Sequence, residues 1–170
     1  MSVSVMRFVS SGAGIVLGGL FVYAGIQKHL APYEFAEAIQ AYQLLPSALV
    51  GLVAATLSWI EIVSGFSLIL GCLLGSRRFS NPFPVGGILR RSGLLLILSQ
   101  SLLFVAVLLI TLARGLKIDC GCGLFFQRQV GLESILEDAL LLGVAGWLYW
   151  RECRAGGLEE GSLVLVQPKG

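Results

Sequence analysis

The feature that most constrains this 170-residue chain is a series of apolar blocks, most of them about as long as a bilayer is thick. A helix needs roughly 20 apolar residues to cross the hydrocarbon core, which is about 30 Å thick. Every backbone polar group inside hydrocarbon must be bonded within its own segment, so these blocks should be helices. The fourth block is the weakest, because two acidic residues lie near its start. The blocks are residues 9–26, 48–74, 93–113 and 135–150.

The composition excludes whole classes of protein. Hydrophobic residues make up 56% of the chain and charged residues 13%, whereas a soluble domain carries about 25% charged residues. A soluble fold is therefore excluded. The net charge of +2 is too weak for a nucleic-acid-binding surface. The chain reads as an all-α membrane protein with a bundle of four transmembrane helices, whose partner is the lipid bilayer and not a nucleic acid.

The first block has a second interpretation. Arg7 precedes it, and Val22-Tyr23-Ala24 loosely resembles a cleavage site, so residues 9–26 also fit a cleavable signal peptide. We favour an uncleaved helix, because the block is long and residues 23–28 resemble an interfacial anchor.

Orientation follows from the lysines and arginines. With four spans, the N-terminus, the second loop and the C-terminal tail carry eight of these residues, and the first and third loops carry four. The bias predicts that both termini are cytoplasmic and that the first and third loops face outward. Residues 1–154 form one predicted membrane domain, and residues 155–170 a flexible tail.

The first outward loop has its own pattern. Pro32 suits the first position of a helix, and Phe35, Ile39 and Tyr42 recur after it at helical spacing. Pro46 closes the run. The pattern predicts a short amphipathic helix on the outer membrane surface, directly after the first span.

The segment Cys120-Gly121-Cys122 carries the clearest chemistry. The glycine lets the backbone bend sharply enough to bring two near-neighbour sulfur atoms together. A disulfide in so short a ring is strained and accepts electrons readily, whereas a structural disulfide closes a long loop. Arg114 favours the reactive thiolate and Asp119 opposes it. The spacing predicts a redox-active pair and a candidate thiol–disulfide oxidoreductase.

Two other interpretations of these cysteines stay open. In the first, both cysteines are unreactive thiols in a glycine-rich turn. In the second, they bind copper or zinc together with His29. No tight cluster of ligands is visible in the sequence, so we predict no metal. Cys72 and Cys153 lie near the predicted cytoplasmic ends of the second and fourth blocks and are predicted to be reduced, partly buried thiols. A role for them as a second redox pair has no support in their spacing.

Glu61 lies in the middle of the second block, where an ionisable residue is costly and marks a candidate functional site. Three functional interpretations are open for Glu61: its carboxyl group is protonated, it pairs with a buried donor, or it relays protons. A purely structural role is the alternative, because Ser58 and Ser64 flank it at helical spacing. Gln100 in the third block is a candidate partner.

Asp138 near the start of the fourth block is a further candidate. Together with Glu137 it favours the positive end of the helix dipole, or it pairs with Arg114 or Lys28. Glycines in the first block indicate close helix packing. They are Gly12, Gly14, Gly18, Gly19 and Gly25.

Four groups of residues resemble the MauE family of methylamine-utilisation membrane proteins, within the broader DoxX-like group. The resemblance runs from about Val9 to Trp150, and its Cys-Gly-Cys part is the most specific. The groups are Tyr23-Ala24-Gly25-Ile26-Gln27-Lys28 with Pro32, Phe35, Ile39, Tyr42 and Leu44-Leu45-Pro46; Trp59-Ile60-Glu61 with Gly65; Arg114-Gly115 with Asp119-Cys120-Gly121-Cys122-Gly123; and Glu137-Asp138-Ala139-Leu140.

The resemblance implies a multi-pass protein of the bacterial inner membrane that acts with a periplasmic thioredoxin-like partner. In the methylamine system such a pair supports maturation of a disulfide-rich secreted dehydrogenase subunit. We expect Cys120 and Cys122 to exchange disulfides with the partner or with a secreted client. The expected supporting residues are Glu61, Lys28, Arg114, Asp119 and Asp138.

The sequence shows no cofactor, and a membrane quinone is a candidate electron carrier. Two functions from other classes stay open. One is a membrane scaffold or transport subunit without a redox step, in which the cysteines form a fixed disulfide. The other is a metal-handling membrane protein that uses His29.

Overall fold

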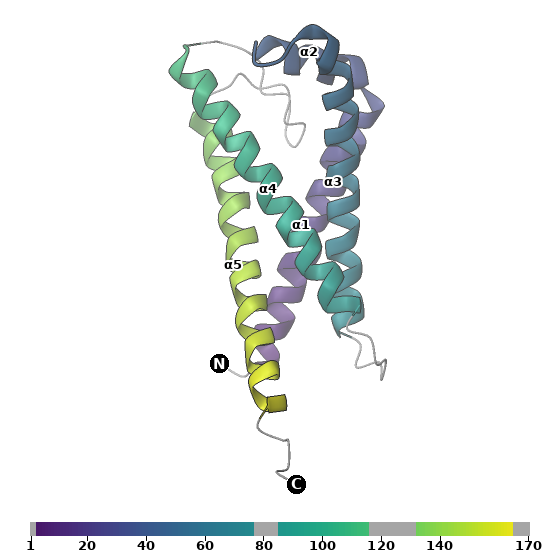
Figure 1. Ribbon diagram of the computed structural model, residues 1–170, viewed down its shortest axis with the longest axis vertical. Helices are drawn as coiled ribbons and strands as arrows, with labels where there is room; N and C mark the ends of the chain where they lie inside the picture. The colour runs from purple at the N-terminus through teal and green to yellow at the C-terminus, as the bar shows by residue number, and fades with distance from the viewer. Residues whose placement is uncertain (1–2, 77–84, 116–131, 165–170) are drawn as a thin grey trace.

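The computed structural model describes residues 3–76, 85–115 and 132–164, with side chains over 8–74, 85–115 and 134–154. Every element in these ranges is a helix. Four long helices form an elongated bundle, and a short one lies across one end, opposite the two termini (Figure 1). The helices are α1 (Val3–Leu30), α2 (Pro32–Ala41), α3 (Ser47–Ser76), α4 (Val85–Ala113) and α5 (Leu132–Val164).

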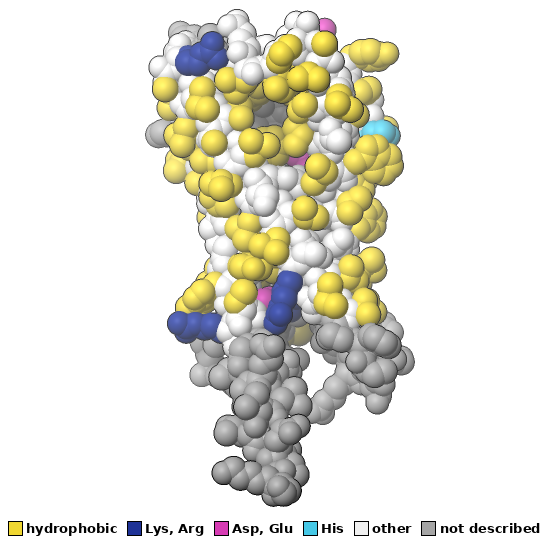
Figure 2. All heavy atoms as spheres, viewed as in Figure 1, with side chains coloured by type: hydrophobic (Ala, Val, Ile, Leu, Met, Phe, Trp, Pro, Cys, Tyr) yellow, Lys and Arg dark blue, Asp and Glu magenta, His cyan; other side chains and the backbone are white. Residues whose placement is uncertain are grey.

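Among the residues that the structure describes, three helices are long and apolar enough to cross a membrane, over Phe8–Leu30, Ser47–Leu74 and Val85–Ala113. Figure 2 shows hydrophobic side chains along the length of the bundle, with lysines and arginines toward its ends. Apolar side chains exposed in this way need a hydrocarbon solvent. The three spans agree with three of the four predicted blocks.

The fourth predicted span is not among these helices. In α5 the stretch without charge is residues 139–150, between Asp138 and Arg151, and it is only about 18 Å long at 1.5 Å per residue. The span over residues 135–150 and the cytoplasmic position of both termini therefore stay predictions. Since α5 reaches Val164, it also takes in part of the predicted tail, whose flexibility stays a prediction.

The predicted amphipathic helix is present as α2. Pro32 occupies its first turn, and Phe35 and Ile39 are buried against Val50 and Ala54 of α3. Because the apolar face of α2 packs on α3, this helix covers the end of the bundle at which α1 ends and α3 begins.

All four long helices contribute to one core cluster. It contains Leu17 and Phe21 of α1, Leu68 and Cys72 of α3, Leu94 and Ile97 of α4, and Ala145 and Leu148 of α5. The side chains of this cluster hold α4 and α5 against the closely packed pair of α1 and α3.

Glycines decide how closely α1 approaches α3. A Cβ atom on Gly18 would lie 2.8 Å from the carbonyl oxygen of Gly65, and one on Gly65 would lie 2.5 Å from that of Gly18. A Cβ atom on Gly14 would likewise lie 2.6 Å from the sulfur atom of Cys72. Gly12 and Gly19 face open space, so the packing role predicted for these two is wrong.

Candidate functional site

The end of the bundle next to α2 contains a buried ion pair. Lys28 near the end of α1 pairs with Glu61 of α3, and only 5% and 2% of their surfaces are exposed. Gly25 makes this pairing geometrically accessible, because a Cβ atom there would lie 2.8 Å from the Ser58 carbonyl oxygen. Close backbone packing therefore places the two charged side chains side by side inside the bundle.

Aromatic rings enclose the ammonium group. The Nζ atom of Lys28 lies 5.3 Å from the ring centre of Phe35 on α2 and 5.1 Å from that of Phe104 on α4. Both distances are within the range of cation–π attraction. Residues from three other helices, α2, α3 and α4, thus stabilise this positive charge away from water.

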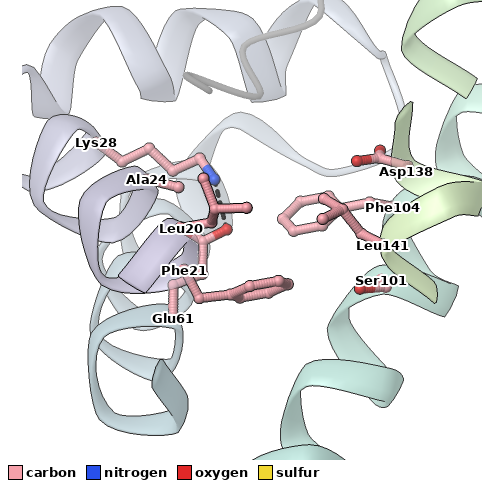
Figure 3. Close-up of a pocket in the computed structure, with 9 residues that line it drawn as sticks. All are labelled: Leu20, Phe21, Ala24, Lys28, Glu61, Ser101, Phe104, Asp138 and Leu141. Carbon is pink, nitrogen blue, oxygen red and sulfur yellow. Dashed lines mark hydrogen bonds and ion pairs between the residues drawn. The ribbon is translucent and has the colours of Figure 1, made fainter. Parts of the chain in front are cut away.

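A cavity lies between this pair and the opposite helices. Asp138 of α5 and Ser101 of α4 face Lys28 and Glu61 across it (Figure 3). Asp138 is 8% exposed and Ser101 is 3% exposed. The other walls of the cavity are apolar, formed by Leu20, Phe21, Ala24, Phe104 and Leu141.

Several oxygen atoms in and beside the cavity lack partners. Within the described residues, no hydrogen bond reaches Glu61 Oε2, Asp138 Oδ2, Ser101 Oγ or Gln100 Oε1. A buried polar atom without a partner is costly and calls for an explanation, such as a bound proton, water or ion. The cavity therefore has unused acceptor capacity on three sides.

The polar residues that flank Glu61 bond elsewhere. Ser58 donates to the Ala54 carbonyl at 2.9 Å, and Ser64 donates to the Glu61 carbonyl at 3.0 Å. Gln100 Nε2 donates to the Ser64 hydroxyl at 3.2 Å. None of these bonds involves the Glu61 carboxylate. The carboxylate pairs instead with the Lys28 ammonium group, which is a buried donor of the kind that the sequence predicted.

Tyr42, just beyond α2, lies close to the same charges. Burial, together with the negative charge of Asp138, raises its pKa to about 12. Arg114 donates from Nη1 to the Tyr42 carbonyl oxygen at 3.2 Å. The structure thus gives Arg114 a backbone partner at the end of the bundle, while Asp138 lies in the cavity with Lys28.

The structure brings together three of the seven predicted site residues, namely Lys28, Glu61 and Asp138. Arg114 lies at the same end of the bundle. Asp119, Cys120 and Cys122 lie outside the described residues. The roles proposed for all seven stay predictions.

Sequence reasoning missed Ser101 and Phe104 as parts of the site. Ser101 follows Gln100 inside an otherwise apolar block, and two consecutive polar residues there are a signal that was available. Phe104 carries no such signal, because one more aromatic residue in a lipid-exposed helix is unremarkable in sequence.

The side chain of Cys72 is buried and that of Cys153 is exposed. They belong to the far part of the bundle, where Arg90 Nη2 lies 3.1 Å from Glu152 Oε1. Within the described ranges no group of three or more metal-binding side chains occurs.

Comparison with known families gives one match. The family model described as methylamine utilisation protein MauE matches residues 6–151, most of the chain. No curated protein and no solved structure matches.

Proposed function

Because the chain belongs to the MauE family of methylamine-utilisation membrane proteins, we propose that it exchanges disulfides with a periplasmic thioredoxin-like partner. The exchanging atoms are the sulfurs of Cys120 and Cys122. The protein resides in the bacterial inner membrane, and its clients are secreted proteins that contain disulfides.

The observation that carries the proposal is the joint presence of a Cys-Gly-Cys segment and a membrane bundle. Helix α4 ends at Ala113 and α5 begins at Leu132, both at the end of the bundle that carries α2 (Figure 1). The connection that contains both cysteines therefore begins and ends at one face of the bundle. This supports a position accessible to a partner outside the lipid.

The exchange conserves atoms and electrons. A thiolate of the partner attacks one sulfur of the Cys120–Cys122 disulfide, a mixed disulfide forms, and the second sulfur leaves as a thiolate. The second thiol of the partner then displaces the attacked cysteine. The partner is oxidised to a disulfide, and the pair is reduced by two electrons to two thiols. Starting from reduced cysteines, the same steps run in reverse.

Repeated turnover needs a second electron carrier. A membrane quinone is the carrier that we propose, because a lipid-soluble carrier reaches the face of the bundle from within the bilayer. It takes up two electrons and two protons when it reoxidises the thiol pair.

Trapping of mixed disulfides tests the proposal. In cells that express the Cys122→Ala protein, the Cys120 thiolate attacks the disulfide of an oxidised partner and forms a mixed disulfide. The Cys122 thiol that would complete the exchange and free the reduced partner is missing. After acid quenching and alkylation, we expect a reductant-sensitive adduct on non-reducing gels. The wild-type protein should give far less of it, and the double variant Cys120→Ala/Cys122→Ala none.

The control for specificity is Cys153→Ser, because Cys153 is an exposed thiol elsewhere in the chain. This change should leave the adduct of the Cys122→Ala protein intact. Failure of both Cys120→Ala and Cys122→Ala to trap any partner would overturn the proposal, as would full function of the double variant, which a pure scaffold predicts.

A further inference from the structure

The cavity carries an excess of negative charge. Lys28, Glu61 and Asp138 come from three helices, and each is at least nine-tenths buried. Lys28 neutralises Glu61 through the ion pair. Asp138 then has no cation in contact with its buried Oδ2 atom within the described residues.

The other charged or titratable groups at this end do not balance it. Glu137 is exposed and acidic. Arg114 is exposed, and its described hydrogen bond goes to the Tyr42 carbonyl oxygen. The side chain of Tyr42 is neutral at ordinary pH. The described charged groups in and beside the cavity thus leave one carboxylate in excess.

A buried carboxylate without a counter-charge costs several kcal/mol, and such a group usually takes up a proton. The donor set also argues against a metal ion. Hard cations take about six or more oxygen ligands, whereas the cavity offers Glu61 Oε2, Asp138 Oδ2 and Ser101 Oγ among apolar walls.

The size of the cavity fits one water molecule. The room open to the centre of a water molecule is about 20 Å³, above the ~10–15 Å³ that holds one water. A buried water makes two to four hydrogen bonds. The three unpartnered oxygens meet that number, and the residues that carry them line the cavity from three helices (Figure 3).

We propose that this cavity is a proton-binding site, in which Glu61 and Asp138 share one exchangeable proton and a water molecule bridges them to Ser101. With this proton bound, one carboxylate charge remains to balance the ion-paired Lys28, so the occupied site is neutral. The proton comes from bulk water at the α2 end of the bundle and returns to it. This inference does not depend on the thiol chemistry proposed above.

Infrared difference spectroscopy of the full-length protein in lipid nanodiscs tests the proposal. At neutral pH we expect the carbonyl band of a protonated carboxylic acid, shifted in D₂O. Glu61→Gln and Asp138→Asn each remove one carboxylate, so the remaining one pairs with Lys28 and needs no proton. Each variant should therefore lose the band.

Two further variants sharpen the test. Glu137→Gln changes the exposed neighbour of Asp138 and should keep the band unchanged. Ser101→Ala removes one partner of the water and should shift the band without abolishing it. Circular dichroism and size-exclusion chromatography check that each variant is folded. Because Glu61→Gln and Asp138→Asn are both isosteric changes, they give two independent tests of the carbonyl band.

Absence of the band from wild-type protein across neutral pH would overturn the proposal. So would a band that survives in both Glu61→Gln and Asp138→Asn. If the wild-type protein shows no such band but binds sodium or ammonium ions, the cavity is a site for one of these cations and not for a proton.

Discussion

Lys28 of α1 and Glu61 of α3 form an ion pair that is almost wholly buried, although 33 positions separate them in sequence. The pair joins the two helices at the level of the cavity, and Asp138 faces it from α5 (Figure 3). The two residues differ in what their loss leaves behind. Without Lys28, two buried carboxylates remain with no base, whereas without Glu61 the ammonium group still has Asp138 across the cavity.

This asymmetry predicts unequal effects of single substitutions. Removing one partner of a buried pair costs about 3–5 kcal/mol, because an uncompensated charge is left in a low dielectric. Lys28→Met should reach this range, and Glu61→Gln should cost clearly less. The free energy of unfolding in mixed detergent micelles measures both.

The double variant Lys28→Met/Glu61→Gln supplies the control. It should recover part of the loss caused by Lys28→Met, since only Asp138 then needs a proton. Equal losses for the two single variants would show that Asp138 does not compensate for Glu61.

The glycine contacts between α1 and α3 give a second prediction with a matched control. In Gly18→Ala the new methyl group meets the backbone oxygen of Gly65 and must push the helices apart. Overpacking of this kind costs about 1–3 kcal/mol. Gly19→Ala places the same methyl group in open space on the next residue and should be neutral or slightly stabilising. Thermal unfolding of both proteins measures the difference, and similar midpoints would contradict this packing.

The sequence alone predicts part of this structure. The apolar blocks predict the helices, since bilayer thickness and backbone satisfaction leave few alternatives, and the periodicity after Pro32 predicts α2. Helix ends are less predictable: α4 starts at Val85 rather than 93, because helices continue past the hydrocarbon into charged segments such as the one around Arg90.

The site was predictable only residue by residue. Glu61 and Asp138 are conspicuous as acids in apolar surroundings, but their arrangement around Lys28 depends on which glycines face α3. In sequence Gly18 and Gly19 are equivalent, and only the rotation of α1 about its axis separates a contact from a lipid-facing position.

Tyr42 predicts a loss of stability at high pH. Burial and the charge of Asp138 raise its pKa from 10.0 to about 12, so between these values the folded protein keeps a proton that the unfolded chain releases. Stability therefore falls as pH rises through this window, by about 2–3 kcal/mol in total at 1.36 kcal/mol per pKa unit. Denaturant titrations of wild-type and Tyr42→Phe proteins at pH values up to 12 measure this loss.

Tyr42→Phe should remove this component of the pH dependence, and Tyr33→Phe, which changes a tyrosine that is 85% exposed, should leave it intact. An identical alkaline loss in wild-type and Tyr42→Phe proteins would show that the phenol of Tyr42 is not the group responsible.

The remaining cysteines report on orientation. Cys153 is exposed, whereas Cys72 is fully buried and packs against Gly14. In a Cys120→Ser/Cys122→Ser background, only Cys153 should therefore react quickly with maleimide.

The lysine and arginine bias predicts a cytoplasmic C-terminus. An impermeant maleimide should then label Cys153 in inside-out vesicles and not in intact spheroplasts. The same reagent should show the reverse pattern on a cysteine introduced at Tyr33, an exposed position on α2 at the opposite end of the bundle. Labelling of Cys153 from the outside would place the α2 end, with its cavity, in the cytoplasm and would remove the periplasmic partner from the proposed function.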